Sequence, residues 1–438
     1  MIKKSILHLL TTAALCMTLP LYACSDEEKM IITPGGSEDK SVTFDLLDYG
    51  ADNTGLNDCS NAFKKLFDAI GNTKHVEIFI PAGKYKLNER VVIDHKTFSG
   101  YDENKGLIVR GAGEDVTEMI CNNDQGVFLF NPATNRITVT VCDLSCVSNK
   151  DARGTAIEFN TANQNAGDAH TRMFQARNIL IRGESAQNGY FKNGVLIYNA
   201  WYPMLDNVKM TGSYGIDADR KMDIGYLFHN CYSPLMTNCY FWGSANYGVR
   251  YLGVNFEPED GIIKDTYLVG QDYGVYVHLA SSPEWSEPAF HISGCHIHYN
   301  VTGVYFEGLR QFFIHGNLIY CYNSQGSKWW AENGRPAETP KPYECRDIHL
   351  MYASDGIISN NQFTEPATPK RYAIDIETNS GNILIDGNIF NFDGTGIRNR
   401  SQQPSRCIGN VFGGDPDFTV GFTPYEDETG TLKKIDFE

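Results

Sequence analysis

Side chains that can transfer protons or hold anions recur at one phase of a repeated sequence pattern. The pattern is Gly-apolar-x-apolar, as in Gly248-Val249-Arg250-Tyr251 and Gly274-Val275-Tyr276-Val277. In an extended strand the apolar positions face one side and the x positions face the other. The x position of each repeat and the residue two places later therefore form one outward surface. Its middle repeats carry Arg250, Tyr276, His278, Tyr305, Glu307 and His349.

These residue types suit proton transfer on an acidic substrate. Histidine and tyrosine exchange protons in catalysis, and arginine binds a carboxylate through paired hydrogen bonds. The six residues are therefore candidate catalytic groups, with Glu307 placed to orient His278 from the next repeat. The alternative interpretation is a polar face with ordinary ion pairs between repeats. Asp375 and Glu377 hold the same two positions in a later repeat and are candidate substrate-binding residues.

A second pattern keeps step with the first. It has an apolar residue, then two residues ending in Asn, Asp or Gly, then alternating apolar positions, and its anchors are positions 207, 238, 265, 294, 316, 360, 387 and 409. Short strands that recur with turns between them close a core only by stacking on neighbouring copies, which predicts a β-solenoid. A β-sandwich is the alternative, but it gives no reason for two strand types to keep step.

One polar phase of the second pattern is expected to point inward. We expect its asparagines to stack and to hydrogen-bond along the solenoid axis; they are Asn317, Asn361, Asn388 and Asn410.

The long step from position 316 to position 360 contains an insertion, 322–344, with aromatic and cationic residues. Flat sugar faces stack on aromatic rings, and a cation beside them suits a carboxylate or a sulfate. A second insertion, 281–288, follows His278 and either rises over the same surface or packs on the sides of the coils. The candidate substrate-binding residues of the two insertions are Trp285, Lys328, Trp329, Trp330 and Arg335.

Two cysteines bracket the first insertion. Cys321 precedes it and Cys345 follows it, so a disulfide between them would clamp the base of the loop. Two further histidines, His296 and His298, lie on the other strand type, but no acidic residue stands at a convincing ligand spacing. The sequence therefore predicts no metal site, and these histidines are expected at the surface.

The first residues resemble a lipoprotein signal. Two lysines and an apolar run precede Leu21-Tyr22-Ala23-Cys24, and the apolar run is too short to span a membrane. We expect 1–23 to be removed, Cys24 to become the lipidated first residue, 24–40 to be a flexible tether and 41–438 to form a single domain. A Cys that happens to follow a signal is the alternative. This predicts a protein anchored to the outer membrane and facing the cell exterior.

Composition narrows the class of partner. The 438 residues are 42% hydrophobic, which excludes a wholly disordered chain. The 41 glycines and the 24 Phe and 24 Tyr favour turns and strands. A net charge of -16 argues against sequence-independent binding of nucleic acid, since phosphate affinity comes from clustered Lys and Arg.

The N-terminal motifs carry a family resemblance. Asp48-Tyr49-Gly50-Ala51-Asp52, a helical pattern after Asn57 or Asp58 as N-cap, and Ile80-Pro81-Ala82-Gly83-Lys84-Tyr85 resemble the start of the pectate-lyase-like right-handed parallel β-helix superfamily. With the repeats, the resemblance covers about 42–414. It implies an all-β, single-domain right-handed parallel β-helix with an N-terminal capping helix, and it leaves the reaction open because the superfamily includes lyases, hydrolases, epimerases, phage tailspikes and non-enzymes.

The candidate residues favour one reaction within that superfamily. A polysaccharide lyase removes the C5 proton of a uronate and expels the 4-linked sugar, which requires a base, an acid and a group that neutralises the carboxylate. We assign His278 as base and Tyr305 as acid, and expect a cell-surface lyase acting on a pectic or glycosaminoglycan-type polysaccharide by β-elimination. No cofactor is required, and calcium is left open.

Two other classes remain open. One is a glycoside hydrolase that uses two of Glu307, Asp375 and Glu377. The other is a non-catalytic lipoprotein that binds glycans without turning them over.

Overall fold

The computed structural model describes residues 41–435 with internal gaps, and all of them belong to one compact unit, Lys40–Glu438. The gaps are 72, 95–105, 133–136, 162–171, 186–187, 213–220, 254–259, 280–287, 322–343, 365–370 and 414–420. The insertions expected at 281–288 and 322–344 therefore lie almost entirely outside the described residues, as do Cys24, Trp285, Lys328, Trp329, Trp330 and Arg335.

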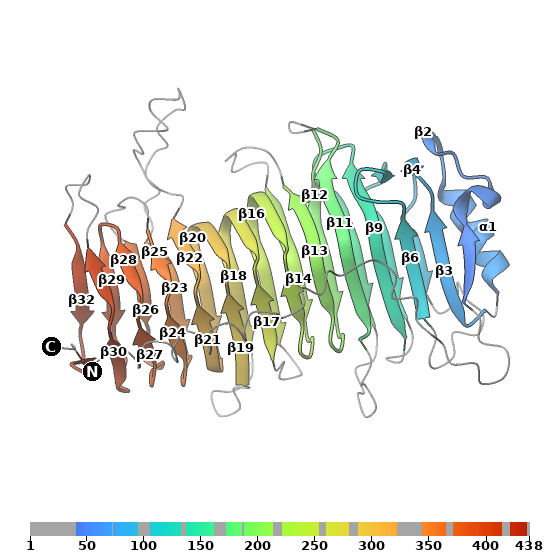
Figure 1. Ribbon diagram of the computed structural model, residues 1–438. Helices are drawn as coiled ribbons and strands as arrows, with labels where there is room; N and C mark the ends of the chain where they lie inside the picture. Colours follow the sequence, from blue (N-terminus) through green and yellow to red (C-terminus); the bar gives the residue numbers. More distant parts are fainter. Residues whose placement is uncertain are drawn as a thin grey trace, which may run out of the picture. The chain divides into compact units, whose positions relative to one another are not determined.

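The described residues form parallel strands that pair with the equivalent strand of the next coil (Figure 1). The pairings make three walls around one core. The first wall contains β5 (Val91–Asp94), β8 (Gly126–Asn131), β10 (Arg153–Asn160), β12 (Phe191–Tyr198), β14 (Met222–His229), the later halves of β16 (Tyr240–Gly253), β18 (Tyr267–Leu279) and β20 (His296–Glu307), then β23 (Cys345–Met351), β26 (Arg371–Ile376), β29 (Thr395–Asn399) and β32 (Thr423–Asp427).

The second wall begins each coil. It contains β1 (Val42–Asp45), β3 (His75–Ile80), β6 (Gly106–Gly111), the first halves of β9 (Thr138–Ser148), β11 (Phe174–Gly183) and β13 (Met204–Thr211), then β15 (Leu235–Thr237), β17 (Gly261–Lys264), β19 (Pro288–Ser293), β21 (Arg310–His315), β24 (Ile357–Ser359), β27 (Leu384–Asp386), β30 (Ser405–Ile408) and β33 (Leu432–Ile435).

The third wall joins the other two. It contains β2 (Thr54–Asp58), β4 (Gly83–Leu87), β7 (Thr117–Cys121), the later halves of β9, β11 and β13, the first halves of β16, β18 and β20, then β22 (Leu318–Cys321), β25 (Gln362–Phe363), β28 (Ile389–Asn391) and β31 (Val411–Gly413). These pairings confirm the predicted parallel β-helix.

The anchors of the second sequence pattern form the turn between the second and third walls. All eight have positive φ, from 49° at Asp265 to 66° at Gly316, and the others are Asn207, Asn238, Gly294, Asn360, Gly387 and Gly409. Left-handed backbone is costly for most residues, but Gly has no Cβ and Asn and Asp tolerate this region. The turn geometry therefore explains why only these three residue types occupy the anchors.

The predicted asparagine stack is confirmed inside the core. Asn317 Nδ2 donates to Asn361 Oδ1 at 2.9 Å, Asn361 Nδ2 donates to Asn388 Oδ1 at 3.0 Å, and the same bond links Asn388 to Asn410 at 3.0 Å. Each side chain also donates to a backbone carbonyl oxygen, as Asn361 does to Ile314 at 2.9 Å. The stack therefore provides hydrogen-bond partners for buried backbone groups at the turns, which the hydrogen bonds between strands do not reach.

The predicted capping helix is present among the first described elements, next to β1 and β2. Helix α1 (Ser60–Ile70) follows η1 (Leu46–Tyr49) and buries Phe63 and Leu66 against the first coils. The predicted N-cap at Asn57 or Asp58 was wrong, because Cys59 occupies that position and makes no side-chain cap. The Asp58 carboxylate instead accepts from the N–H of Ser60 at 3.1 Å and from its hydroxyl at 2.7 Å.

The predicted disulfide between Cys321 and Cys345 is not formed in the structure. Both side chains are buried, and their Sγ atoms lie 3.9 and 3.6 Å from the backbone oxygen of Asn300, to which they donate. The two residues face the core because each holds an inward position of its strand, so each thiol can reach a backbone acceptor. Among the described residues no helix is long and apolar enough to cross a membrane.

Replacing Asn361 with Ala should lower the free energy of unfolding by about 3 kcal/mol. The change removes the acceptor of the Asn317 N–H and Nδ2 groups, which stay buried without it. Urea titration of the two proteins measures the difference. The matched control is Asn360→Gly, one residue away at an exposed position with φ 54°, where the change should cost less than about 1 kcal/mol. Equal losses for the two variants would contradict a stabilising role for the stack.

Candidate functional site

Strand register brings the predicted catalytic residues together on the first wall. Tyr276 pairs with Arg250 on one side and with Tyr305 on the other, and Tyr305 pairs with His349. His278 and Glu307, which stand two positions after Tyr276 and Tyr305, also pair with each other. Because paired residues of adjacent coils are about 4.8 Å apart, the side chains are direct neighbours. The phase predicted for the Gly-apolar-x-apolar segments is therefore confirmed.

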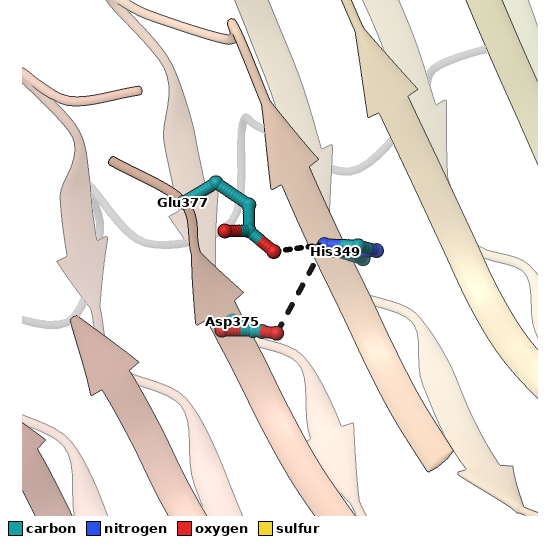
Figure 2. Close-up of side chains that lie close together, drawn as sticks. All are labelled: His349, Asp375 and Glu377. Carbon is teal, nitrogen blue, oxygen red and sulfur yellow. Dashed lines mark hydrogen bonds and ion pairs between the residues drawn. The ribbon is translucent and has the colours of Figure 1, made fainter. Parts of the chain in front are cut away.

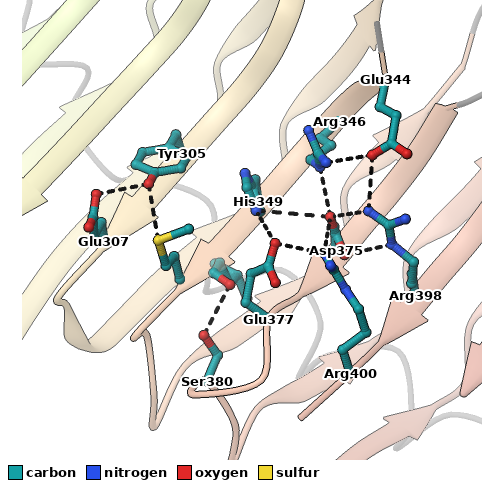
Figure 3. A network of polar contacts seen from close by, with 12 residues as sticks. Tyr305, Glu307, Glu344, Arg346, His349, Asp375, Glu377, Ser380, Arg398 and Arg400 are labelled. Carbon is teal, nitrogen blue, oxygen red and sulfur yellow. Dashed lines mark hydrogen bonds and ion pairs between the residues drawn. The ribbon is translucent and has the colours of Figure 1, made fainter. Parts of the chain in front are cut away.

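Glu307 connects the two residues assigned to proton transfer. Its Oε2 lies 2.6 Å from Nδ1 of His278. The same oxygen accepts a hydrogen bond from the Tyr305 hydroxyl at 2.8 Å (Figure 3). An ionised carboxylate has only acceptors, so neutral His278 carries its proton on Nδ1 and leaves Nε2 as a proton acceptor. The His278 side chain is 36% exposed, so a substrate can reach it.

Tyrosine rings form the floor around this group. Tyr276 and Tyr305 stack at 4.7 Å between ring centroids with 9° between their planes, and Tyr273 meets both edge-on. Burial raises the pKa of Tyr305 well above its ordinary value, and the hydrogen bond to Glu307 adds to the rise. Burial also raises the pKa of Tyr276. Both phenols therefore keep their protons at neutral pH.

Arg250 is held by aromatic contacts rather than by a carboxylate. Its guanidinium carbon lies 4.6 Å from the centroid of the Tyr247 ring and 5.8 Å from that of Tyr276. Its Nε is buried and makes no hydrogen bond. Within the part of the chain that the structure describes, no Asp or Glu forms an ion pair with it. Arg250 therefore presents a fixed positive charge beside the Tyr276 and His278 positions.

Asp375 is the centre of a different cluster, made of three arginines. It accepts from Arg346 Nε at 2.7 Å, from Arg398 at 2.9 and 2.6 Å, and from Arg400 at 2.9 and 3.0 Å (Figure 3). Its side chain is 0% exposed. Burial would raise the pKa of Asp375, but the bonds and charges of the arginines outweigh burial and lower the pKa to about 2.

The prediction that Asp375 binds substrate directly was therefore wrong. Its position on the strand points outward, but arginines from the preceding and the following coil cover the carboxylate. Two of them, Arg346 and Arg398, are also bound to Glu344 at 2.6 and 3.4 Å. Their charges are thus already balanced, unlike that of Arg250.

His349 and Glu377 connect the arginine cluster to the tyrosine floor. His349 Nε2 lies 2.9 Å from Glu377 Oε1 (Figure 2). The same oxygen also accepts from Arg400 at 2.6 Å (Figure 3). The His349 ring meets that of Tyr305 edge-on at 5.1 Å. Burial lowers the pKa of His349, so its imidazole is neutral near pH 7. Both residues are held in place by these contacts, which suits positioning more than direct chemistry.

The same residues do not fit a metal ion. Donor atoms of His349, Asp375 and Glu377 lie within 4.8 Å of one another, the spacing of a metal site (Figure 2). However, the Asp375 oxygens are occupied by three guanidinium groups, and Glu377 accepts a further hydrogen bond from Arg400. A divalent cation at this point would face their positive charges.

Besides the x positions and the residues two places later, the first wall has a third row of outward residues, which sequence reasoning missed. Tyr247, Tyr273, Arg346 and Tyr372 belong to it, through the register of β16, β18, β23 and β26. The sequence could have revealed them, because each stands three positions before an x residue of the Gly-apolar-x-apolar pattern. The arginines of the cluster were visible at outward positions, but their shared contact with Asp375 depends on side-chain conformation.

Replacing Asp375 with Asn should destabilise the protein by at least about 3 kcal/mol at pH 7, because three arginines lose their ionised partner. A carboxyl with a pKa lowered to about 2 contributes stability above the unfolded value of 3.8, and that contribution is lost as the pH falls toward 2. The difference between wild type and Asp375→Asn should therefore shrink by roughly 2 kcal/mol between pH 5 and pH 2. Urea titrations over this range measure it.

The exposed carboxylate Asp265 provides the control. Asp265→Asn should change stability by less than about 0.5 kcal/mol at each pH. A difference for Asp375→Asn that stays constant with pH would contradict an ionised Asp375 in the folded state.

Comparisons with known proteins agree with the fold. Residues 252–415 match the family described as the right handed beta helix region. No curated protein sequence matches the chain. The A-module of the mannuronan C-5 epimerase AlgE6 of Azotobacter vinelandii is 11% identical, with a TM-score of 0.60, over 90% of this chain and 100% of that chain.

Other solved structures with this fold differ in activity. The catalytic unit of a GH87 α-1,3-glucanase of Streptomyces thermodiastaticus is 12% identical, with a TM-score of 0.54, over 92% of this chain and 70% of that chain. The surface adhesin PfbA of Streptococcus pneumoniae is 13% identical, with a TM-score of 0.52, over 90% of this chain and 93% of that chain. At these identities the similarity concerns the fold alone. The chain thus has the fold of a right-handed parallel β-helix, and its residues 252–415 match the model of that family.

Proposed function

We propose that the protein is a polysaccharide lyase that cleaves a uronic-acid-containing polysaccharide by β-elimination on the first wall. The observation that carries the proposal is the shared Oε2 of Glu307, which contacts both His278 and Tyr305 and holds them next to each other. Arg250, whose charge no described carboxylate balances, lies two coils from Tyr305 across Tyr276. The three groups are the base, the acid and the carboxylate-binding cation that the reaction requires.

The proposed reaction begins at His278. Nε2 takes the proton from C5 of the uronate, while Arg250 binds the carboxylate and stabilises the negative charge that develops as the C5–H bond breaks. The electron pair forms the C4–C5 double bond, and the bond from C4 to the glycosidic oxygen breaks. Tyr305 donates its proton to that oxygen. The products are an unsaturated uronate and a new reducing-end partner, with no water consumed.

The carboxylates of the first wall support hydrolysis less well. A β-helix hydrolase needs two carboxyl groups on either side of the glycosidic bond, about 5 to 10 Å apart. Asp375 is enclosed by arginines, and Glu377 is bound to His349 and Arg400. Of these three described carboxylates only Glu307 remains, and it already binds His278 and Tyr305. One carboxylate is not sufficient for either hydrolytic route.

Epimerisation is the second candidate. It begins with the same removal of the C5 proton but returns a proton to the opposite face instead of expelling the neighbouring sugar. The fold similarity to a mannuronan C-5 epimerase draws attention to this outcome. Incubation in deuterium oxide separates the two, because an epimerase incorporates deuterium at C5 without shortening the chain.

We also propose that the protein is attached to the outer membrane, facing outward, by a lipid on Cys24. The support is the sequence Leu21-Tyr22-Ala23-Cys24 after a basic and apolar start. Cells grown with radiolabelled palmitate should yield labelled protein, and Cys24→Ala should abolish the label and release the protein from the membrane fraction. Label that persists in Cys24→Ala would refute the anchor.

Replacing His278 with Ala should lower kcat on the cleaved polysaccharide by at least about 1000-fold, because the base is lost. Pectic, alginate and glycosaminoglycan substrates should be tested, and the absorbance of the unsaturated uronate gives the rate. The melting temperature should change little, since His278 is partly exposed and lies outside the core. Reducing ends that appear without that absorbance would favour hydrolysis instead.

Two further variants make this test specific. Glu307→Gln keeps the shape but weakens the hold on His278, and a loss of about 10- to 100-fold is expected. His291→Ala removes a histidine of the second wall that stacks on Phe313 at 4.6 Å and should leave the rate unchanged. Full activity in Glu307→Gln would contradict its role in orienting the base.

A further inference from the structure

A group of aromatic side chains lies on the outer surface of the third wall, on the coils of β16, β18, β20 and β22 (Figure 1). Tyr240 of β16 pairs with Tyr267 of β18, and Tyr267 pairs with His296 of β20. Tyr240 is 39% exposed and Tyr267 is 50% exposed, so folding leaves apolar surface of both rings in water. A second row stands two positions further along these strands. We call the two rows together the aromatic platform; its members are Tyr240, Trp242, Tyr267, His296, His298 and Tyr320.

The rings of the first row do not cover one another's faces. Tyr240 and Tyr267 have ring centroids 6.2 Å apart with 44° between their planes, and Tyr267 meets the His296 ring at 5.7 Å and 66°. Rings that pack face to face within the same wall lie closer and more nearly parallel. Phe363 and Phe390 of the core, for example, stack at 4.9 Å with 25° between their planes. The tilt therefore leaves part of each exposed tyrosine face open to a ligand.

Tyr320 fixes the two histidines of the platform. Its hydroxyl lies 2.7 Å from Nε2 of His296, and its ring lies against that of His298 at 4.3 Å between centroids. Burial lowers the pKa of both histidines, to about 3 in His298, so both are neutral near pH 7. The aromatic platform therefore carries no charge of its own. Lys209, which pairs with Tyr240 on the preceding coil, is already bound to Glu114 at 2.8 Å.

An uncharged surface of rings and hydroxyl groups fits a polysaccharide. Pyranose rings present flat faces of C–H groups that pack on aromatic rings, and their hydroxyl groups bond to polar tips such as those of tyrosine. Neighbouring coils are about 4.8 Å apart, so a linear chain of sugar rings can lie across several of them. Nucleic acid fits poorly because the platform has no Lys or Arg for phosphate. A folded protein also fits poorly, since a stable interface takes about 20 to 30 residues on each partner.

We propose that the aromatic platform is a second glycan-binding site, which holds one stretch of a polysaccharide through the C–H faces of its sugars while another stretch occupies the first wall. The platform and the proposed catalytic residues share β16, β18 and β20, so a polymer bound there stays close to the first wall after each cleavage. Binding at the platform does not require the proposed function. Because its contacts carry no charge, it persists in salt, unlike carboxylate binding by Arg250.

Biolayer interferometry of the full chain on immobilised polysaccharides tests the proposal. His278→Ala is the parent protein, so that no polymer is cut, and the probes are polygalacturonate, alginate, chondroitin sulfate and hydroxyethylcellulose. Binding is measured at about 0.05 M and about 0.5 M NaCl, because high salt screens contacts between charges and leaves stacking contacts in place. The parent should bind at least one of these polymers at the higher salt concentration. Binding that is lost in high salt, or no binding, would overturn the proposal.

Variants of the two exposed tyrosines identify the surface. Tyr240→Ala with Tyr267→Ala should weaken binding in high salt by at least about tenfold, because both stacking faces are lost. Tyr240→Phe with Tyr267→Phe keeps both rings and should weaken it by less than about threefold. The matched control is Ile389→Ala with Val411→Ala, which shortens two exposed aliphatic side chains further along the same row. It should leave the affinity unchanged, and an equal loss there would overturn the assignment to sugars.

The outcomes separate this inference from the proposed function and from self-association. Loss of high-salt binding in Tyr240→Ala with Tyr267→Ala, for a protein that cleaves no uronate polymer, would refute the lyase assignment and leave the platform standing. Cleavage of a polymer, together with unchanged binding in that variant, would overturn the platform and leave the lyase assignment standing. Light scattering examines the remaining occupant. A wild-type dimer that the same variant dissociates would assign the surface to a second copy of the chain and overturn the assignment to sugars.

Discussion

In-register stacking of parallel strands is the constraint on which the rest of the structure depends. Residues of equal phase lie above one another, so side chains that are 29 positions apart, such as His278 and Glu307, become hydrogen-bonded neighbours. The glycine column permits this close approach. A Cβ on Gly274 would lie 2.6 Å from the backbone oxygen of Gly303, and Gly248 would meet Gly274 in the same way. Without these glycines the coils could not keep their register along the first wall.

The first wall divides its charges between two regions. Around Asp375 the arginines are neutralised by buried or half-buried carboxylates, and this cluster braces the later coils. Around Tyr276 the only described cation, Arg250, lies on aromatic rings and lacks an ionic partner. A charge that the protein itself leaves unbalanced is available for a ligand, whereas a balanced one is not. This contrast, more than the number of polar residues, locates the proposed site.

Much of this arrangement could be predicted from the sequence because it depends on local rules. The anchors at positions such as Asn360 and Gly387 must tolerate left-handed backbone, and the Gly-led segments must alternate, so the walls and the phase of His278 follow. What could not be predicted depends on side-chain conformation. The burial of Asp375 results from arginines of the two neighbouring coils folding over it, and Cys321 and Cys345 both donate to the backbone oxygen of Asn300.

The most direct test of the account is a crystal structure of His278→Ala with a bound uronate oligosaccharide. The account predicts that one carboxylate lies within about 3 Å of the end of the Arg250 guanidinium, and that C5 of a uronate faces the space left by the imidazole. The glycosidic oxygen should lie near the Tyr305 hydroxyl. An oligosaccharide that leaves the first wall empty, or that has its carboxylate on the arginines around Asp375, would contradict it.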